Sequence, residues 1–482
     1  MHALPVLLLE AALCTPAAPP GGGKPAPEAL APITDVAALV KAVNGGSPGD
    51  RIAVGPGTFE LTEPLRVESG MTLAGAGPGE TALTPAPTWT PAPTDRPDNE
   101  TDYNTADESA YLIVVEPRAQ SVMIRGLTLR STAERGGLHG AILSRDAEDL
   151  TLRNLHVGPF RWSGVRLFHS KGGSITDCRF TDAGGRMRVT KGPVGGSIFV
   201  RWAHGLEIAH NTFEITPDHP DHVYGVKGRG ARDVRIHHNT IRCNFAIEFP
   251  FEGESGMEID HNYLDGVVSI PKHAGGPVPE DGSPTFHLHH NYFMRSYSIE
   301  GTRNALVVER NLFDFDPAVD GGNLMASFGR AAAPGPVTFR DNLVRNPGRG
   351  VFWSDPAYDR LSFRNNHVVG VETATPRTEG LFGIDANSDF STIEFVNNRV
   401  ELTGPPRPLV RNEASLAATF ENNRLTGVSD ADRTSGPRTD AAVGPREPLE
   451  FRVGARGEYR VDGFSIAPVE PADADPPAGG GD

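Results

Sequence analysis

Apolar and polar residues alternate in short runs along most of this chain, and each run ends in the same local setting. An apolar–x–apolar triplet is followed by two polar residues, an asparagine, one further residue and another apolar residue, as in 234–239 (VRIHHN). We call the position of that asparagine the Asn slot. It is occupied by Asn154, Asn211, Asn239, Asn262, Asn291, Asn311, Asn342, Asn366, Asn398 and Asn423, and once by Cys178. Alternation of this kind predicts short β-strands.

Successive Asn slots lie roughly 20 to 33 residues apart, which is the spacing of repeat architectures. Such spacings are too short for a strand–helix–strand unit, so each repeat is expected to be one coil of parallel strands stacked on the last. The slot asparagine would bond its counterparts one coil above and below, at an inward-turning corner. The sequence therefore predicts an all-β fold: one right-handed parallel β-helix, a solenoid.

A short amphipathic helix is expected before the first coil. Thr34 is a suitable N-cap, apolar residues recur at helical spacing over 36–43, and 44–45 (NG) ends the pattern. A solenoid exposes apolar core at its ends, so this helix would act as a lid. The expected divisions are an export leader and Pro/Ala/Gly-rich linker (1–31), the cap and first coils (32–83), an acidic Pro-rich insertion (84–110), the coils (111–428), and a closing segment with a disordered tail (429–482).

Composition and charge limit the kinds of molecule that this protein is expected to bind. A net charge of −16 argues against nucleic acid, which requires clustered Lys and Arg. Three cysteines provide no disulfide framework, and Cys178 and Cys243 are expected to be small buried residues. No stretch approaches the roughly 18 apolar residues that cross a membrane. The apolar stretch 4–9 (LPVLLL) is typical of an export signal, so we expect the protein to be secreted, periplasmic or at the cell surface. We also expect a monomer.

The segment 49–59 (GDRIAVGPGTF) reads as a strand and a tight turn directly after the cap helix. Together with the coil pattern, it resembles the start of the pectate-lyase-like superfamily of parallel β-helix proteins. The resemblance implies a polysaccharide partner. Members include lyases, hydrolases, epimerases and proteins without catalysis, so the fold alone does not assign a reaction.

A second strand follows each slot by about ten residues. We align these strands on the inward residues Val165, Val226, Ile247, Ile270, Ile299 and Phe352. Alternation then places the next residue of each strand on the outer face. The outer residues are Arg166, Lys227, Glu248, Pro271, Glu300 and Trp353, with Lys272 and Arg303 close behind their strands. Lys227, Trp353 and Tyr297 are the candidates for binding a sugar chain.

Elimination next to a uronate needs a cation for the carboxylate, a base and an acid. Glu248 with Glu252 or Glu254 offers the oxygen ligands that calcium prefers. Lys272 is the candidate base, its pKa lowered in a partly dry groove, and Arg303 can bind the carboxylate through its fork of donors. This arrangement resembles the alginate lyase and chondroitin-B lyase family, which pairs a Lys base with an Arg beside acidic calcium ligands.

Other interpretations stay open. Tyr224, with the His and Asp residues of 218–222, is a further acid–base candidate. Glu248 and Glu300 are expected two coils apart, about 10 Å, near the upper limit for the two carboxylates of an inverting glycoside hydrolase. The alternating charges can equally form a plain salt-bridge ladder. A carbohydrate-binding or surface β-helix protein without turnover is the remaining alternative.

Histidine precedes the slot asparagine in four successive coils, at His210, His238, His261 and His290, with His237 and His289 alongside. Stacked histidines can bind a transition metal. A corner beside the slot is also a turn, and histidine is common in turns that face solvent. We prefer the turn interpretation for this column.

Overall fold

The computed structural model describes most of the chain after its first thirty residues. The described residues are 31–89, 108–131, 138–160, 162–184, 195–216, 223–249, 255–270, 284–294, 297–300, 305–316, 324–328, 336–348, 350–354, 358–371, 380–384, 390–412, 418–429, 452–453, 459–461 and 464–466. The chain divides into two units, 1–31 and 32–482. The predicted leader lies outside the described residues, and the helices and strands named below all belong to the second unit.

Parallel strands stack in three sheets, each strand pairing with its counterpart one coil later. The first sheet contains β1 (Arg51–Ala53), β4 (Thr72–Ala74), β7 (Met123–Leu129), β9 (Thr151–Val157), β11 (Ser174–Thr176), β14 (Glu207–Ala209), β17 (Arg235–His237), β19 (Met257–Asp260), β21 (Phe286–His289), β24 (Leu306–Glu309), β27 (Val337–Arg340), β30 (Tyr358–Arg364), β33 (Phe390–Val396) and β37 (Ala418–Glu421). The second contains β2 (Gly57–Leu61), β5 (Thr81–Pro85), β12 (Arg179–Thr181), β15 (Thr212–Glu214), β18 (Thr240–Glu248), β20 (Tyr263–Ser269), β22 (Tyr292–Phe293), β25 (Leu312–Asp314), β28 (Leu343–Arg345), β31 (His367–Val371), β34 (Arg399–Thr403) and β38 (Arg424–Thr426).

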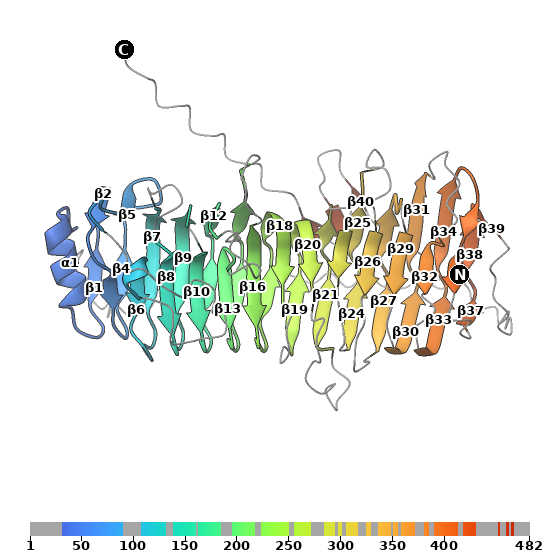
Figure 1. Cartoon of the computed structure of the whole chain (residues 1–482), viewed down its shortest axis with the longest axis horizontal. Helices are drawn as coiled ribbons and strands as arrows, with labels where there is room; N and C mark the ends of the chain where they lie inside the picture. The colour runs from blue at the N-terminus through green and yellow to red at the C-terminus, as the bar shows by residue number, and fades with distance from the viewer. Residues whose placement is uncertain are drawn as a thin grey trace, which may run out of the picture. The chain divides into compact units, whose positions relative to one another are not determined.

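The third sheet carries the candidate site. It contains β3 (Leu65–Val67), β6 (Tyr111–Val115), β8 (Gly140–Arg145), β10 (Ser163–Phe168), β13 (Ile198–Arg201), β16 (Tyr224–Arg229), β23 (Tyr297–Glu300), β26 (Leu324–Phe328), β29 (Gly350–Ser354), β32 (Phe382–Ile384) and β36 (Val410–Asn412). Four long strands continue around a corner: β7 and β9 also reach the second sheet, and β18 and β20 also reach the third. Successive strands lie side by side from the cap helix to the last coil (Figure 1). The predicted parallel β-helix is confirmed.

Inward side chains of the three sheets form one apolar core, as alternation predicts. Phenylalanines stack in register between coils, for example Phe339 on Phe363 with ring centroids 5.0 Å apart and Phe363 on Phe395 at 5.3 Å. Cys178 and Cys243 are both buried in this core, and burial raises the pKa of the Cys178 thiol to about 12. The cysteines therefore act as small apolar residues, as predicted.

The slot asparagines form a continuous hydrogen-bonded ladder. Asn239 Nδ2 donates to Asn262 Oδ1 at 3.0 Å and to the Ile208 carbonyl at 2.9 Å. The Asn239 backbone N–H also donates to Asn262 Oδ1, at 3.0 Å. The ladder runs through Asn211, Asn239, Asn262, Asn291, Asn311, Asn342, Asn366, Asn398 and Asn423. Each amide thus satisfies polar groups that the corner would otherwise bury.

The prediction was wrong for Asn154, which lies one residue before the slot. In the pairing of β12 with β9, Arg179 is opposite His156, so Leu155 is opposite Cys178 and Asn154 is opposite Asp177. Asn154 and Asp177 both have φ near +50°, as do the residues before each later slot asparagine. Asparagine tolerates this left-handed conformation well, which explains its presence at that corner.

The N-terminal helix α1 (Val36–Asn44) is present and covers the first coil, packing Leu39 and Val43 against β2 and β3. Its N-cap is Asp35, whose side chain accepts a hydrogen bond from the Ala38 N–H at 2.8 Å. The predicted cap, Thr34, was therefore one residue too early. Asn44 ties the helix end to the coil by accepting from the Arg66 N–H at 2.8 Å.

The remaining elements are short. A 3-10 turn η1 (Glu108–Ala110) precedes β6, and β35 (Arg407–Pro408) pairs with β39 (Val428–Ser429). The strands β40 (Arg452–Val453), β41 (Tyr459–Val461) and β42 (Phe464–Ile466) form an antiparallel sheet within the predicted closing segment. Within the part of the chain that the structure describes, no helix has the length and apolar character of a membrane span.

Candidate functional site

One row of outward positions crosses the third sheet and carries the charged residues of interest. The pairings align Arg66, Val114, Leu143, Arg166, Phe199, Lys227, Glu248, Ser269, Glu300, Ser327, Trp353, Gly383 and Arg411. The predicted shared row of Arg166, Lys227, Glu248, Glu300 and Trp353 is confirmed. The row also includes Phe199 and Ser327, from two coils that the predicted row did not contain.

Lys227 and Glu248 form an ion pair between adjacent coils. Lys227 Nζ lies 3.0 Å from Glu248 Oε2, and the two side chains are 4% and 12% exposed. The ammonium also lies 4.7 Å from the ring centroid of Tyr224, which stacks on Phe245 with centroids 4.8 Å apart. An ammonium over an aromatic face is stabilised by the ring quadrupole. The Lys227 ammonium therefore lies between a carboxylate and an aromatic face.

Arg166 lies two coils before Lys227, on the same row, and is 3% exposed. Its guanidinium lies 4.7 Å from the ring centroid of Phe199 and 5.3 Å from that of Phe168. Among the residues the structure describes, Arg166 has no carboxylate partner, and its buried Nε has no hydrogen-bond acceptor. A buried charge without a partner is costly, so a guanidinium in this setting calls for an anionic ligand.

The coils before Arg166 balance their cations internally. Glu108, at the end of the predicted insertion, contacts Arg66 at 2.9 Å and Arg145 at 2.7 Å. In the same coils, the outward residues Val114 and Leu143 are apolar. They are buried with Tyr111 in a small second cluster outside the main core. Arg166 lies against this apolar cluster, which continues past it through Phe168 and Phe199.

The register of β20 differs from the predicted one by two residues. Val268, not Ile270, lies opposite Ile247, so Ser269 takes the outward place expected for Pro271. The cause is two extra residues in β18. Three steps from Arg242 to Phe245 face two from Asp265 to Val267, and two steps from Phe245 to Ile247 face one from Val267 to Val268. Alternation alone does not reveal such extra residues.

Several predicted site residues lie outside the described residues. They are Lys272, Arg303, Glu252 and Glu254. Glu300 and Tyr297 are described as backbone of β23 only, and Trp353 is half-buried on β29. The proposed base and carboxylate binder therefore stay predictions.

Calcium was expected at Glu248 with Glu252 or Glu254. Of these three, only Glu248 is described, and its carboxylate pairs with Lys227 at 3.0 Å. Calcium needs six to eight oxygen ligands, and an ammonium against the carboxylate competes with a cation. Because Glu252 and Glu254 lie outside the described residues, the calcium ion stays a prediction.

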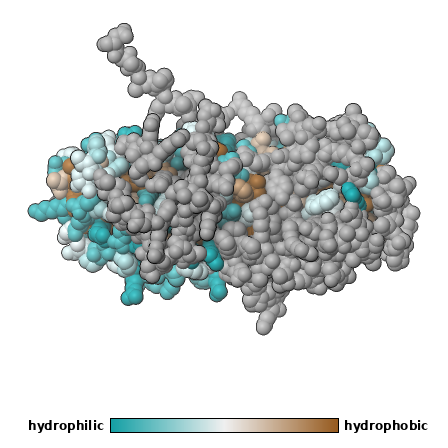
Figure 2. Space-filling view, viewed as in Figure 1, coloured by the Kyte–Doolittle hydropathy of each residue, from teal (hydrophilic) through white to brown (hydrophobic). Residues whose placement is uncertain are grey.

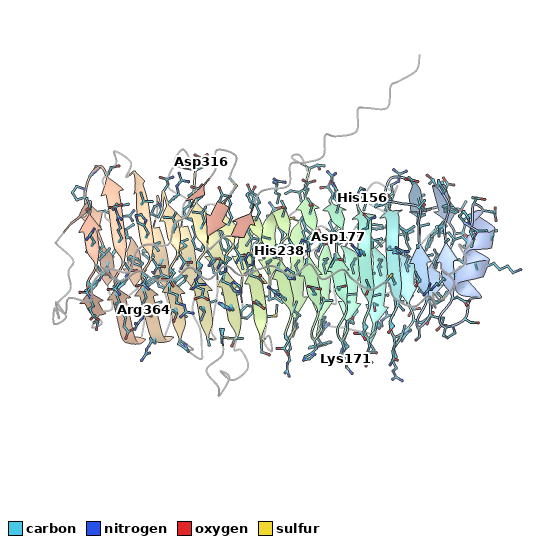
Figure 3. All side chains as sticks on the ribbon, turned by 180° about the vertical axis from the view of Figure 1, so that it is seen from behind. His156, Lys171, Asp177, His238, Asp316 and Arg364 are labelled. Carbon is cyan, nitrogen blue, oxygen red and sulfur yellow. The ribbon has the colours of Figure 1, made fainter. Side chains whose placement is uncertain are left out.

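A second polar surface covers the outer face of the first sheet near the slots, and we call it the histidine patch. Its members are Glu207, His210, Arg235, His237, His238, Glu258, Asp260, His261, His287, His289, His290 and Glu309, from five successive coils. His238 stacks on His261 with ring centroids 4.9 Å apart, and His261 stacks on His290 at 4.9 Å. Figure 3 labels His238 near the middle of the coil stack. The sequence located six of the seven histidines, all but His287, and none of the carboxylates that contact them.

Titration within the patch follows from burial and crowding. Burial, and then the neighbouring His261, His237 and His210, lower the pKa of His238 to about 4, so its ring is neutral at pH 7. Burial opposes the ionisation of Asp260, but hydrogen bonds from His261 and Arg235 outweigh it and hold the pKa of Asp260 below its usual range. Burial, followed by the nearby His287, lowers the pKa of His289.

The described surface has few large apolar side chains. Met123, Trp202 and Met294 are the exposed large hydrophobic residues among those described, each just under two-fifths exposed. The coloured part of the surface in Figure 2 is mainly hydrophilic, with brown in small areas only. Trp202 is covered on one side by Arg201, whose guanidinium lies 3.8 Å from the ring centroid. These residues are separate points rather than an apolar docking face.

Comparison with known proteins supports the architecture. A family model described as a right-handed β-helix region matches residues 111–293. Together with the strand pairing, this match defines the class of the protein: a right-handed parallel β-helix protein. The comparison with curated proteins found no match.

Solved structures with similar architecture include two from different sources. The surface adhesin PfbA of Streptococcus pneumoniae is 12% identical, covers 89% of this chain and 95% of its own, and has a TM-score of 0.46. A mutant tailspike protein of E. coli bacteriophage HK620, in complex with a pentasaccharide, is 11% identical, covers 83% of this chain and 78% of its own, and has a TM-score of 0.48. At these identities and scores, neither protein indicates what this chain binds.

Proposed function

We propose that this protein binds an acidic polysaccharide along the outer face of the third sheet and cleaves it by β-elimination, outside the cytoplasm. The observation that carries the proposal is Arg166, a buried guanidinium without a carboxylate partner among the described residues. Lys227 lies two coils away on the same row, about 10 Å at the usual strand spacing. A uronate carboxylate would supply the negative charge that the described surroundings of Arg166 do not.

The described residues act by binding and orientation. Arg166 can hold a carboxylate through its fork of donors, and Lys227 can neutralise the charge of a neighbouring sugar. Lys227 is paired with Glu248 at 3.0 Å, so it does not serve as the base. The base remains Lys272 in this proposal, with Arg303 as a second carboxylate binder, Glu300 and Tyr224 as acid–base candidates, and Trp353 and Tyr297 as sugar-stacking residues.

The first experiment is ultraviolet absorbance during incubation with alginate, pectate, chondroitin sulfate and dermatan sulfate. Elimination creates an unsaturated uronate, so absorbance is expected to rise with one of these substrates. A parallel incubation with a calcium chelator tests the calcium proposal, because loss of the signal would indicate a required calcium ion. A flat trace on every substrate, from protein shown to be folded, would reject the lyase.

Variants separate binding from chemistry. Lys272→Ala and Arg303→Ala are each expected to abolish turnover while retention on a gel carrying the same polysaccharide persists. Arg166→Met and Lys227→Met are expected to reduce retention at least about tenfold, because a hydrogen bond to a charged group contributes about 1.5–3 kcal/mol. Matched controls are Arg153→Met and Lys171→Met, exposed cations that are paired with Asp177 and Glu148 and lie outside the outward row. Figure 3 shows Lys171 at the lower edge.

The Lys227–Glu248 ion pair favours one alternative, a binding protein without turnover. Both side chains are engaged with each other near the centre of the row, so neither is available there as a catalytic acid or base. Retention that depends on Arg166 and Lys227, with no product of any kind, would identify that function. Release of reducing ends without ultraviolet absorbance would instead identify hydrolysis, with Glu248 and Glu300 two coils apart as the carboxylates.

A further inference from the structure

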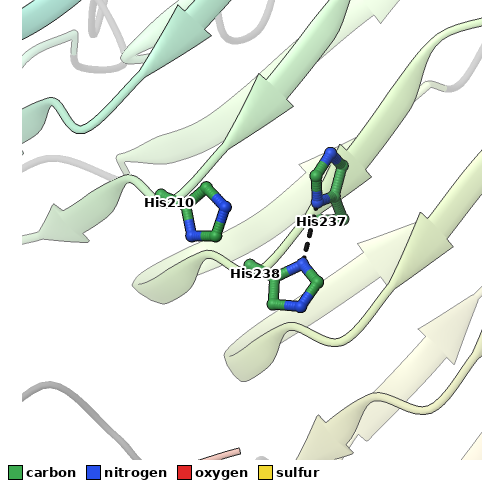
Figure 4. Close-up of side chains that lie close together, drawn as sticks. All are labelled: His210, His237 and His238. Carbon is green, nitrogen blue, oxygen red and sulfur yellow. Dashed lines mark hydrogen bonds between the residues drawn. The ribbon is translucent and has the colours of Figure 1, made fainter. Parts of the chain in front are cut away.

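Three imidazoles of the histidine patch converge where β14 and β17 end. His210 follows β14, while His237 closes β17 and His238 follows it (Figure 4). Nδ1 of His237 lies 2.8 Å from Nδ1 of His238, and the His210 and His238 rings stack with centroids 5.0 Å apart. One ring nitrogen from each of the three lies within 4.8 Å of the others.

Glu207 fixes which nitrogen of His237 is available. Glu207 Oε1 lies 2.9 Å from His237 Nε2, and a carboxylate only accepts, so Nε2 donates. The lone pair of the neutral ring is then on Nδ1, directed at His238. A carboxylate on the far nitrogen of a histidine is the arrangement that orients metal-binding imidazoles in proteins.

The donor set indicates which ions can bind. Three imidazole nitrogens suit zinc, copper and nickel, whereas calcium and magnesium require oxygen ligands. A zinc–nitrogen bond of about 2.0–2.1 Å places tetrahedral ligand nitrogens roughly 3.3 Å apart. Binding therefore requires the His237–His238 contact to open slightly and the stacked His210 ring to turn toward the ion. Moving the His238 proton from Nδ1 to Nε2 frees both Nδ1 lone pairs without releasing a proton. His210 and His238 are exposed, so an ion can enter and a fourth position is open to water.

The neighbouring groups are less suitable. Asp260 lies near His238, but both of its oxygens accept from Arg235, at 2.9 Å each. The pair His289 and His290 repeats the 2.8 Å contact between Nδ1 atoms, with Glu258 3.1 Å from His289 Nε2. The convergent all-nitrogen group among the described residues is the one at His210, His237 and His238. The charge of the nearby Arg235 is balanced by Asp260 and by Glu258, the latter at 3.5 Å.

We propose that His210, His237 and His238 bind one divalent transition-metal ion, such as Zn²⁺, with Glu207 as the positioning residue. The ion joins the corners of two successive coils on the first sheet. This site differs in sheet and in ligand chemistry from the acidic-glycan face of the third sheet.

Isothermal titration of the full-length, chelator-treated protein with Zn²⁺ tests the site. Wild-type protein is expected to bind one ion that excess Ca²⁺ does not displace. Glu207→Gln is expected to weaken binding about 10- to 100-fold, as loss of an orienting partner does, and His237→Gln by more than that. His238→Gln changes an exposed ring, so it keeps the test valid even if the buried His237 variant does not fold.

The control is His204→Gln, which removes an exposed histidine paired with Asp233 at 2.9 Å and not part of the trio. Binding should be unchanged in this variant. Cobalt(II) provides a second readout, because coordination by three histidines in a four-coordinate site gives intense visible absorption. Equal Zn²⁺ affinity in wild type and His238→Gln, or an equal loss in His204→Gln, would overturn the proposal.

Discussion

At the scale of single residues, the slot asparagines explain why one polar residue recurs inside an apolar solenoid. Asn262 is fully buried, and its side-chain amide makes four hydrogen bonds to other coils, two as donor and two as acceptor. Removal would leave buried backbone and amide groups on both neighbouring coils without partners. The desolvation cost of those groups, not the bond energies, dominates the effect.

We expect Asn262→Ala to lower the free energy of unfolding by about 3–5 kcal/mol. Asn423→Ala is the matched control, because Asn423 is half-buried at the last rung and, among the described residues, has no further asparagine to donate to. It should cost about half as much. Urea denaturation followed by circular dichroism measures both, and equal losses would show that the ladder does not act as a continuous network.

At the scale of strands, the sequence predicted the sheets and most of the outward row, because alternation and the slot report them directly. It predicted the N-terminal helix from the helical spacing of its apolar residues. The prediction failed where extra or displaced residues shift the strand register, because the alternation pattern does not reveal such a shift. The two extra residues of β18 between Arg242 and Ile247 moved Ser269 into the row, and Leu155 rather than Asn154 fills an early slot. The contact of Glu207 with His237 depends on which coils are neighbours, so it leaves no local signal in the sequence.

Glu309 illustrates how three strands of the first sheet share one charge. Its carboxylate on β24 contacts His287 of β21 at 2.8 Å and Arg340 of β27. Burial opposes ionisation of Glu309, but hydrogen bonds from His287 and Arg340 outweigh it and lower its pKa to about 2. A carboxyl with a lowered folded-state pKa stabilises the fold above its unfolded pKa and loses that contribution as pH falls.

The pH window for Glu309 therefore runs from its ordinary value of 4.5 down to about 2. We expect wild-type protein to be more stable than Glu309→Gln at pH 7, with the difference shrinking as the pH falls through this window. Glu63→Gln, an exposed change in the first coils, should follow the wild-type profile. Thermal unfolding across the pH range gives the comparison, and a constant difference between wild type and Glu309→Gln would contradict the expectation.

At the scale of the whole solenoid, stability depends on covering the end of the coil stack. Each coil buries its core against its neighbours, so the first coil needs another cover, which α1 supplies through Leu39 and Val43. An uncovered end would present apolar core and unpaired strand edges to other molecules. The expected monomer therefore depends on this nine-residue helix.

Leu39→Asp should uncover that end, because Leu39 is fully buried and a carboxylate in its place has no partner among the described residues around it. We expect a loss of about 3 kcal/mol or more in the free energy of unfolding, together with association that rises with protein concentration. Ala37→Asp adds the same charge to the exposed first turn of α1, where a negative charge suits the helix dipole. Light scattering after size exclusion measures the mass of both variants. Monomeric Leu39→Asp protein with unchanged stability would mean that the stack does not rely on its helical cover, and that the first coil is stable with its apolar end in water.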